Sequence, residues 1–115
     1  MHNYNDRKFR SKNSSSNAEV SGETLFHYFQ EDNIVWANYK GGSIVRGQLL
    51  GLVDESGNIE MRYQHINVEE QLMTGKCISK PEILSDGRIR LHEEWEWTSG
   101  DLSKGNSVLE ELVAS

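Results

Sequence analysis

The sequence predicts an all-β protein, a single up-and-down antiparallel meander barrel of about eight strands. Three observations lead to this fold class. Short runs of aromatic and β-branched residues alternate with a period of two. Turn signals separate these runs at close intervals, and the 115 residues contain ten glycines against one proline. Because 115 residues make one ordinary domain, we expect residues 1–115 to form a single β-barrel domain.

Seven segments have the strand pattern, and an eighth near the N-terminus has it more weakly. In order these are residues 24–30, 34–40, 43–53, 58–67, 71–80, 88–98 and 107–113, with residues 4–10 as the possible eighth. Gly41-Gly42 and Asp86-Gly87 are hairpin turn signals, since glycine accepts the positive φ of primed turns. We expect Pro81 to end the strand before it, because proline cannot donate to an interior ladder.

The connections between these segments are short, which suits antiparallel neighbours. The one low-complexity stretch, residues 13–22, is rich in Ser and Asn, and we predict a flexible loop there. Closing the sheet is the only way to remove all of its edges. An eight-stranded barrel has an interior just wide enough to be filled by side chains or to hold one small ligand.

The alternation predicts which side chains line the barrel lumen. In the segment 88–98 one face is mostly apolar, and Glu93 lies in its middle, before Trp95 and Trp97. A carboxylate there needs a partner or stays protonated, since an isolated buried charge is expensive. In the segment 58–67 the corresponding face carries Tyr63 and His65.

The strand 43–53 has an unusual face on which Val45, Gly47, Leu49, Gly51 and Val53 alternate. Two glycines on one face leave either room for a ligand or a tight bend of the barrel wall.

An apolar pocket with a few convergent polar groups is the general form of a small-molecule site. The predicted lumen candidates are Tyr63, His65, Glu93, Trp95 and Trp97. The leading hypothesis is therefore a non-enzymatic barrel that binds a small, partly apolar ligand. One alternative is a filled barrel whose outer surface forms a homo-oligomer. Another is acid/base chemistry by Glu93 with His65 or Tyr63, which requires hydrogen-bond reach between them.

Composition narrows the partners and the compartment. The net charge of -6 argues against a nucleic-acid surface. No apolar run approaches the roughly 20 residues that cross a bilayer, and residues 1–24 lack a signal-peptide pattern. The single Cys77 cannot form an internal disulfide, so we expect a cytoplasmic protein. His92, Glu94 and Glu96 share a face with Arg90, which favours a solvated surface over a metal site.

No catalytic residue, metal ligand or cofactor is assigned from the sequence. The fragment Gln48–Val53 resembles the pyrophosphate-holding loop of GNAT-type acetyltransferases. It has Val53 where that loop has Gly or Ala, and a turn follows it where that loop opens a helix.

Three longer segments resemble one family. They are residues 39–51, from Tyr39 to Gly51, then Gly75-Lys-Cys77, and then residues 86–101, which include Trp95-Glu-Trp97-Thr98. Together they resemble a family of small, largely uncharacterised bacterial proteins, over about residues 3–112. The resemblance implies an avidin-like or lipocalin-like meander barrel. Members are often labelled N-acetylglutamate synthase, which would imply acetyl transfer from acetyl-CoA to glutamate. The sequence does not contain the nucleotide-binding βα unit that would bind acetyl-CoA.

Overall fold

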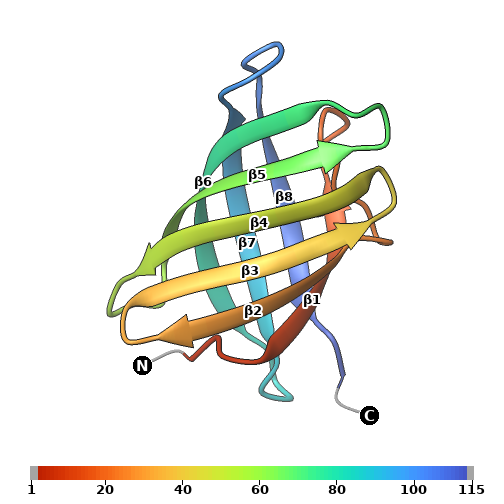
Figure 1. Ribbon diagram of the computed structural model, residues 1–115. Coiled ribbons are helices and arrows are strands. Elements are labelled where there is room, and N and C mark those ends of the chain that lie inside the picture. Colours follow the sequence, from red (N-terminus) through yellow and green to blue (C-terminus); the bar gives the residue numbers. More distant parts are fainter. Residues whose placement is uncertain (1–2, 114–115) are drawn as a thin grey trace.

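The computed structural model describes residues 3–113, and all their regular elements are strands that form one closed antiparallel barrel (Figure 1). Each strand pairs with the next in sequence, and β8 pairs with β1 to close the sheet. The strands are β1 (Arg7–Ser14), β2 (Leu25–Glu31), β3 (Ile34–Gly41), β4 (Ile44–Val53), β5 (Ile59–Asn67), β6 (Leu72–Ile83), β7 (Ile89–Trp97) and β8 (Lys104–Glu111). The predicted eight-stranded meander barrel is confirmed.

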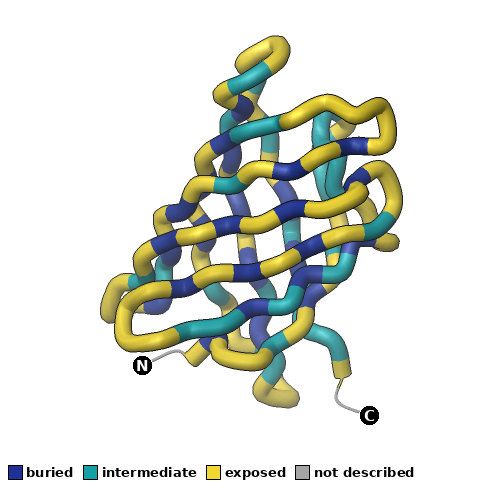
Figure 2. The backbone as a smooth tube through the Cα atoms, viewed as in Figure 1, coloured by how far each residue is buried: buried dark blue, intermediate teal, exposed yellow. Residues whose placement is uncertain are grey.

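Burial alternates along the strands with the expected period of two, as the alternating blue and yellow of Figure 2 shows. In β7 the inward face contains Glu93, Trp95 and Trp97, as predicted. In β5 the inward face includes Tyr63, which is half-buried, and His65, which is buried. The lumen therefore holds the core, and the outer faces of the strands carry most of the charge.

Three strands differ from the sequence-based expectation by more than one residue: the first, the sixth and the eighth, and β8 spans Lys104–Glu111 rather than residues 107–113. The first strand begins at Arg7 rather than residue 4 and continues through Ser14, so the first two residues of the predicted 13–22 loop belong to β1. β6 continues through Pro81 to Ile83. Proline is tolerated there because β5 pairs with β6 only as far as Ser79, so on that side no ladder bond is lost.

A β-bulge changes the inward face at the start of β4. The register shifts between Ile44 and Arg46, opposite a second shift between Tyr39 and Gly41. As a result Ile44 is buried and Val45 is exposed, although simple alternation groups Val45 with the inward Gly47. One extra residue in the bulged strand reverses the phase of the side chains.

The two ends of the barrel are built differently. At the end where both termini lie (Figure 1), the segment before β1 crosses the opening. There buried Tyr4 donates its hydroxyl to Gly57 O at 2.5 Å, while its N–H donates to Gln30 Oε1. We call this the closed end. The other end, the mouth, is covered by the β1–β2 loop, residues 15–24. No helix of residues 3–113 has the length and apolar character needed to cross a membrane.

Candidate functional site

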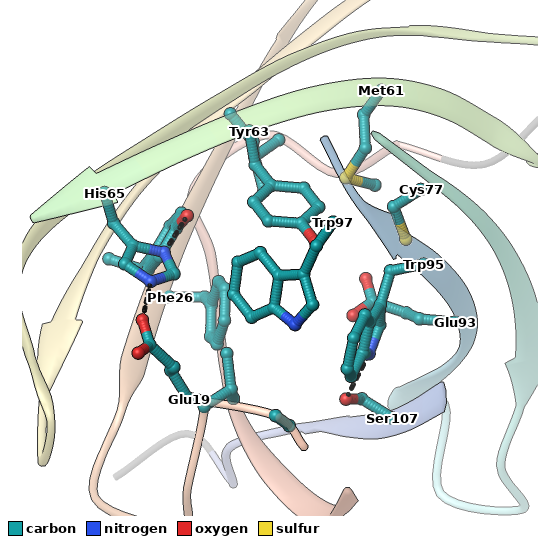
Figure 3. A pocket seen from close by; sticks show the side chains of 14 residues that line it. Glu19, Phe26, Met61, Tyr63, His65, Cys77, Glu93, Trp95, Trp97 and Ser107 are labelled. Atoms are coloured by element: carbon teal, nitrogen blue, oxygen red, sulfur yellow. Dashed lines mark hydrogen bonds and ion pairs between the residues drawn. The ribbon is translucent and has the colours of Figure 1, made fainter. Parts of the chain in front are cut away.

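The half of the lumen nearer the mouth contains a cavity of about 40 Å³. That is room for roughly three waters, or for a group of a few heavy atoms. All five predicted lumen residues line it, and Figure 3 shows their side chains around it. The lining residues are Ala18, Glu19, Val20, Phe26, Tyr39, Leu49, Met61, Tyr63, His65, Cys77, Glu93, Trp95, Trp97 and Ser107.

Glycines in the wall determine where the aromatic rings of this cavity lie. Tyr63 is the cross-strand partner of Gly75, and a Cβ on Gly75 would lie 2.1 Å from the Tyr63 ring. Trp95 and Gly105 form a second such pair, in which a Cβ on Gly105 would lie 2.3 Å from the indole. The rings therefore lie flat against the backbone instead of filling the barrel axis.

Gly47 is the third glycine of this kind, and it resolves the alternatives that the sequence left for β4. A Cβ on Gly47 would lie 2.3 Å from the ring of its partner Tyr39 and 2.8 Å from His65 Cβ. At Gly51 the space is taken by Met61 and by the backbone of β5. The room beside both glycines is occupied by neighbouring side chains rather than left open for a ligand.

The aromatic rings form a continuous array along one side of the cavity. The Tyr39 ring stacks on Phe26 at 4.7 Å between centroids and meets His65 edge-on at 5.7 Å. Trp97 then contacts both His65 at 5.7 Å and Trp95 at 5.4 Å. Such rings supply a large rigid contact area for a flat or cationic group.

A polar cluster joins the β1–β2 loop to the barrel wall at the mouth. His65 Nε2 lies 2.6 Å from Glu19 Oε1, and its Nδ1 lies 3.0 Å from the Tyr39 hydroxyl. Asn67 Nδ2 donates to the second Glu19 oxygen at 3.0 Å. Burial lowers the pKa of His65 more than the hydrogen bond and charge of Glu19 raise it. A neutral ring that donates from Nε2 and accepts at Nδ1 satisfies both contacts.

Asn17 holds the other side of the same loop. Its carbonyl accepts a hydrogen bond from Trp97 Nε1 at 3.2 Å. Its side-chain amide donates to Ser103 Oγ and to Lys104 O, both at 2.9 Å. The β1–β2 loop is thus attached to the cavity wall by polar contacts of Glu19 and Asn17, and its Ala18 and Val20 pack against the core.

Glu93 lies at the base of the cavity, between Ser79 on β6 and Ser107 on β8 in the strand register. Burial raises the pKa of Glu93 to about 8, so the carboxyl is mostly protonated at neutral pH. Ser79 lies close enough to oppose this increase slightly, yet Ser79 Oγ has no partner of normal hydrogen-bond geometry among the described residues. The Tyr28 hydroxyl, near enough for the charge of Glu93 to raise its pKa, also has no such partner.

The structure does not assemble the acid/base pair that was one alternative. Both ring nitrogens of His65 are engaged by Tyr39 and Glu19, and within residues 3–113 neither His65 nor Tyr63 hydrogen-bonds to Glu93. Burial raises the pKa of Cys77 far above its usual value. In the same part of the chain no three His, Cys, Asp or Glu side chains are grouped closely enough to hold a metal ion.

Sequence reasoning missed two important residues of this site. Tyr39 is an inward residue of β3, and alternation within that strand could have located it. Glu19 lies in an irregular segment that has no periodicity, so no sequence signal linked it to His65, 46 residues further along.

A closed eight-stranded meander with an aromatic lumen and polar groups at its base belongs to a class of barrels suited to enclosing small molecules. The comparison with protein families gives the same answer. Residues 2–112 match the avidin-like protein family, and the chain belongs to that family. Barrels of this family typically bind small ligands. No curated protein matches the chain.

Proposed function

We propose that the protein binds a small, partly apolar molecule in the mouth half of its lumen. The observation that carries this proposal is the cavity of about 40 Å³, which has aromatic walls and the buried carboxyl of Glu93 at its base. A ligand with a polar atom at its buried end would meet Glu93, while Trp95 and Trp97 would contact its apolar part.

Access to the cavity requires movement of the β1–β2 loop. The free volume of about 40 Å³ holds only the end of a metabolite-sized molecule, so the rest must pass beneath residues 15–24. The loop is attached by Glu19 and Asn17 through hydrogen bonds that water can replace. Loop opening of this kind is common where ligands enter an enclosed site.

Native mass spectrometry after incubation with a metabolite extract tests the proposal, with tryptophan fluorescence as a second readout. We expect a mass shift for the wild-type chain. Trp97→Phe removes part of the ring surface that lines the cavity and should weaken the binding several-fold. The absence of any bound species and of any fluorescence change across the extract would refute lumen binding.

A specific surface feature favours a second function, self-association. On the outer face of β3 and β4, Trp36 pairs with Leu50 and Ile34 pairs with Leu52 across the strands. All four are exposed, and the Trp36 ring stacks on Phe29 at 5.9 Å. An exposed apolar patch on a sheet is typical of interfaces, and a second copy would cover it.

Light scattering of the purified chain tests this second proposal. We expect a dimer or larger species for the wild type and a monomer for Leu50→Lys, which places a charge in the middle of the patch. Glu55→Lys, an exposed change in the β4–β5 turn, is the control and should leave the mass unchanged. A monomeric wild type at high micromolar concentration would contradict self-association.

A further inference from the structure

The side chains that line the cavity can supply negative charge but little positive charge. Its ionisable lining groups include two carboxyls, Glu93 and Glu19, and none of the Lys or Arg side chains of residues 3–113 lines it. His65 does not supply the missing positive charge at neutral pH, because burial lowers its pKa. Within residues 3–113 Glu93 forms no ion pair, whereas the acidic groups on the outer surface, such as Glu110, pair with arginines.

The aromatic walls of the cavity attract cations, as the carboxyls do. Trp95, Trp97, Tyr63 and Tyr39 all line the cavity with aromatic rings. The face of an aromatic ring is negative, so it attracts cations, and most strongly where water is excluded. An anionic group would meet two carboxyls and several ring faces without a compensating charge.

Glu93 has one hydrogen-bond donor beside it for its ionised form. Ser79, its cross-strand partner on β6, lies close enough to lower the pKa of the Glu93 carboxyl. Hydroxyl donors stabilise a carboxylate over a carboxylic acid. Among residues 3–113 no cationic side chain forms an ion pair with the Glu93 carboxylate.

We propose that the buried end of the ligand is an organic cation, an alkylammonium group of about four heavy atoms, for which Glu93 is the counter-ion and the aromatic rings are the walls. This inference rests on the lumen-binding function proposed above and names its ligand class. The size follows from the cavity of about 40 Å³.

Binding of a cation should be linked to the loss of the Glu93 proton. With a pKa of about 8 the carboxyl is mostly protonated at pH 7, so an entering cation displaces the proton into solvent. Among residues 3–113 no cationic side chain is near enough to shift the pKa of Glu93. The titratable groups that do face it or share its cavity are Tyr28, Tyr39, Tyr63, His65, Cys77 and Glu19.

Three small probes of nearly the same shape separate charge from fit: choline, its neutral carbon isostere 3,3-dimethyl-1-butanol, and the anion 3,3-dimethylbutanoate. Tryptophan fluorescence and calorimetric titrations at pH 8 would measure their affinities. We expect choline to bind about tenfold more tightly than the isostere, and the anion to bind weakest. Because the choline ammonium does not titrate, its affinity should rise roughly 50-fold from pH 6 to pH 8, following ionisation of Glu93.

Glu93→Gln should abolish both the preference for choline and its pH dependence, while 3,3-dimethyl-1-butanol still binds. Glu94→Gln is the matched control, because Glu94 is the next residue of β7 but lies on the exposed outer face; it should behave as wild type. Circular dichroism would verify that both variants fold. Equal or tighter binding of the neutral isostere by the wild type would overturn the cation inference and leave lumen binding intact. Failure of all three probes to bind would also overturn it, and the metabolite screen would then judge lumen binding separately.

Discussion

The closed end and the mouth of the barrel are sealed by different chemistry. At the closed end Tyr4 packs on Tyr28, and Phe9 meets Tyr28 edge-on at 5.0 Å between ring centroids, all fully buried. At the mouth an irregular loop is held by Glu19 and Asn17 through hydrogen bonds. Apolar packing is lost only when the fold opens, whereas hydrogen bonds of partly exposed side chains can be exchanged for bonds to water. The comparison predicts that the mouth opens locally at a lower free-energy cost than the closed end.

Glu93, at the boundary between the two halves, should produce the largest effect. Its pKa is about 8 in the folded chain against an ordinary 4.5, so the folded state holds a proton that the unfolded state releases. Stability should therefore fall as pH rises from about 4.5 to 8, by about 1.4 kcal/mol per unit and up to about 5 kcal/mol in total. Urea unfolding across this range would measure it. Glu93→Gln should remove this slope and Glu94→Gln should keep it; identical slopes in all three proteins would contradict the prediction.

Truncation of one apolar residue at each end tests the comparison directly. Phe9→Ala removes a fully buried ring at the closed end and should lower the free energy of unfolding by about 3–5 kcal/mol. Val20→Ala removes two methyl groups from the partly buried loop residue that packs against the core. That change should cost about 1 kcal/mol or less. Chemical denaturation would measure both, and similar losses would show that the loop contributes as much as the closed end.

Substitution of one glycine in the barrel wall and of one glycine in the loop tests the same comparison. Gly75→Ala would place a methyl 2.1 Å from the Tyr63 ring, so the ring must move into the cavity, at a cost of about 1–3 kcal/mol. Gly22→Ala in the loop would meet only Ser11 O, at 3.7 Å, and should be neutral or stabilise by a few tenths of a kcal/mol. Thermal unfolding would rank the two variants, and a tolerated Gly75→Ala would show that the ring is not confined by the glycine.

The sequence predicted the barrel well because the alternation of residues within each strand shows which side chains face the lumen and which face solvent. Alternation alone placed Glu93, Trp95 and Trp97 on one buried face. Alternation could not show that Trp95 rests on Gly105, because that pairing depends on register between separate strands.

One local feature was predicted wrongly and one was missed, both for the same reason. Pro81 was expected to end β6, and it does not, because β5 no longer pairs with β6 there. Whether a proline interrupts a ladder depends on the length of the neighbouring strand, which a single segment does not reveal. The contact of Glu19 with His65 is likewise a property of the closed barrel rather than of either segment.

A small effect on stability is also expected at the mouth, where Glu19 joins the loop to the wall. Glu19→Gln leaves one acceptor oxygen for the two donors at His65 Nε2 and Asn67 Nδ2, so one hydrogen bond is lost. Global stability should change by about 1 kcal/mol or less, since one hydrogen bond is lost and the Glu19 side chain is still partly reached by water, with 24% of it exposed. The amides of residues 15–24 should nevertheless exchange with solvent several-fold faster, because they need only local opening. Glu23→Gln, an exposed change in the same loop, is the control. If exchange in the loop were equal in both variants, Glu19 would not be the residue that keeps the mouth closed. The difference between the closed end and the mouth would then have to depend on Asn17.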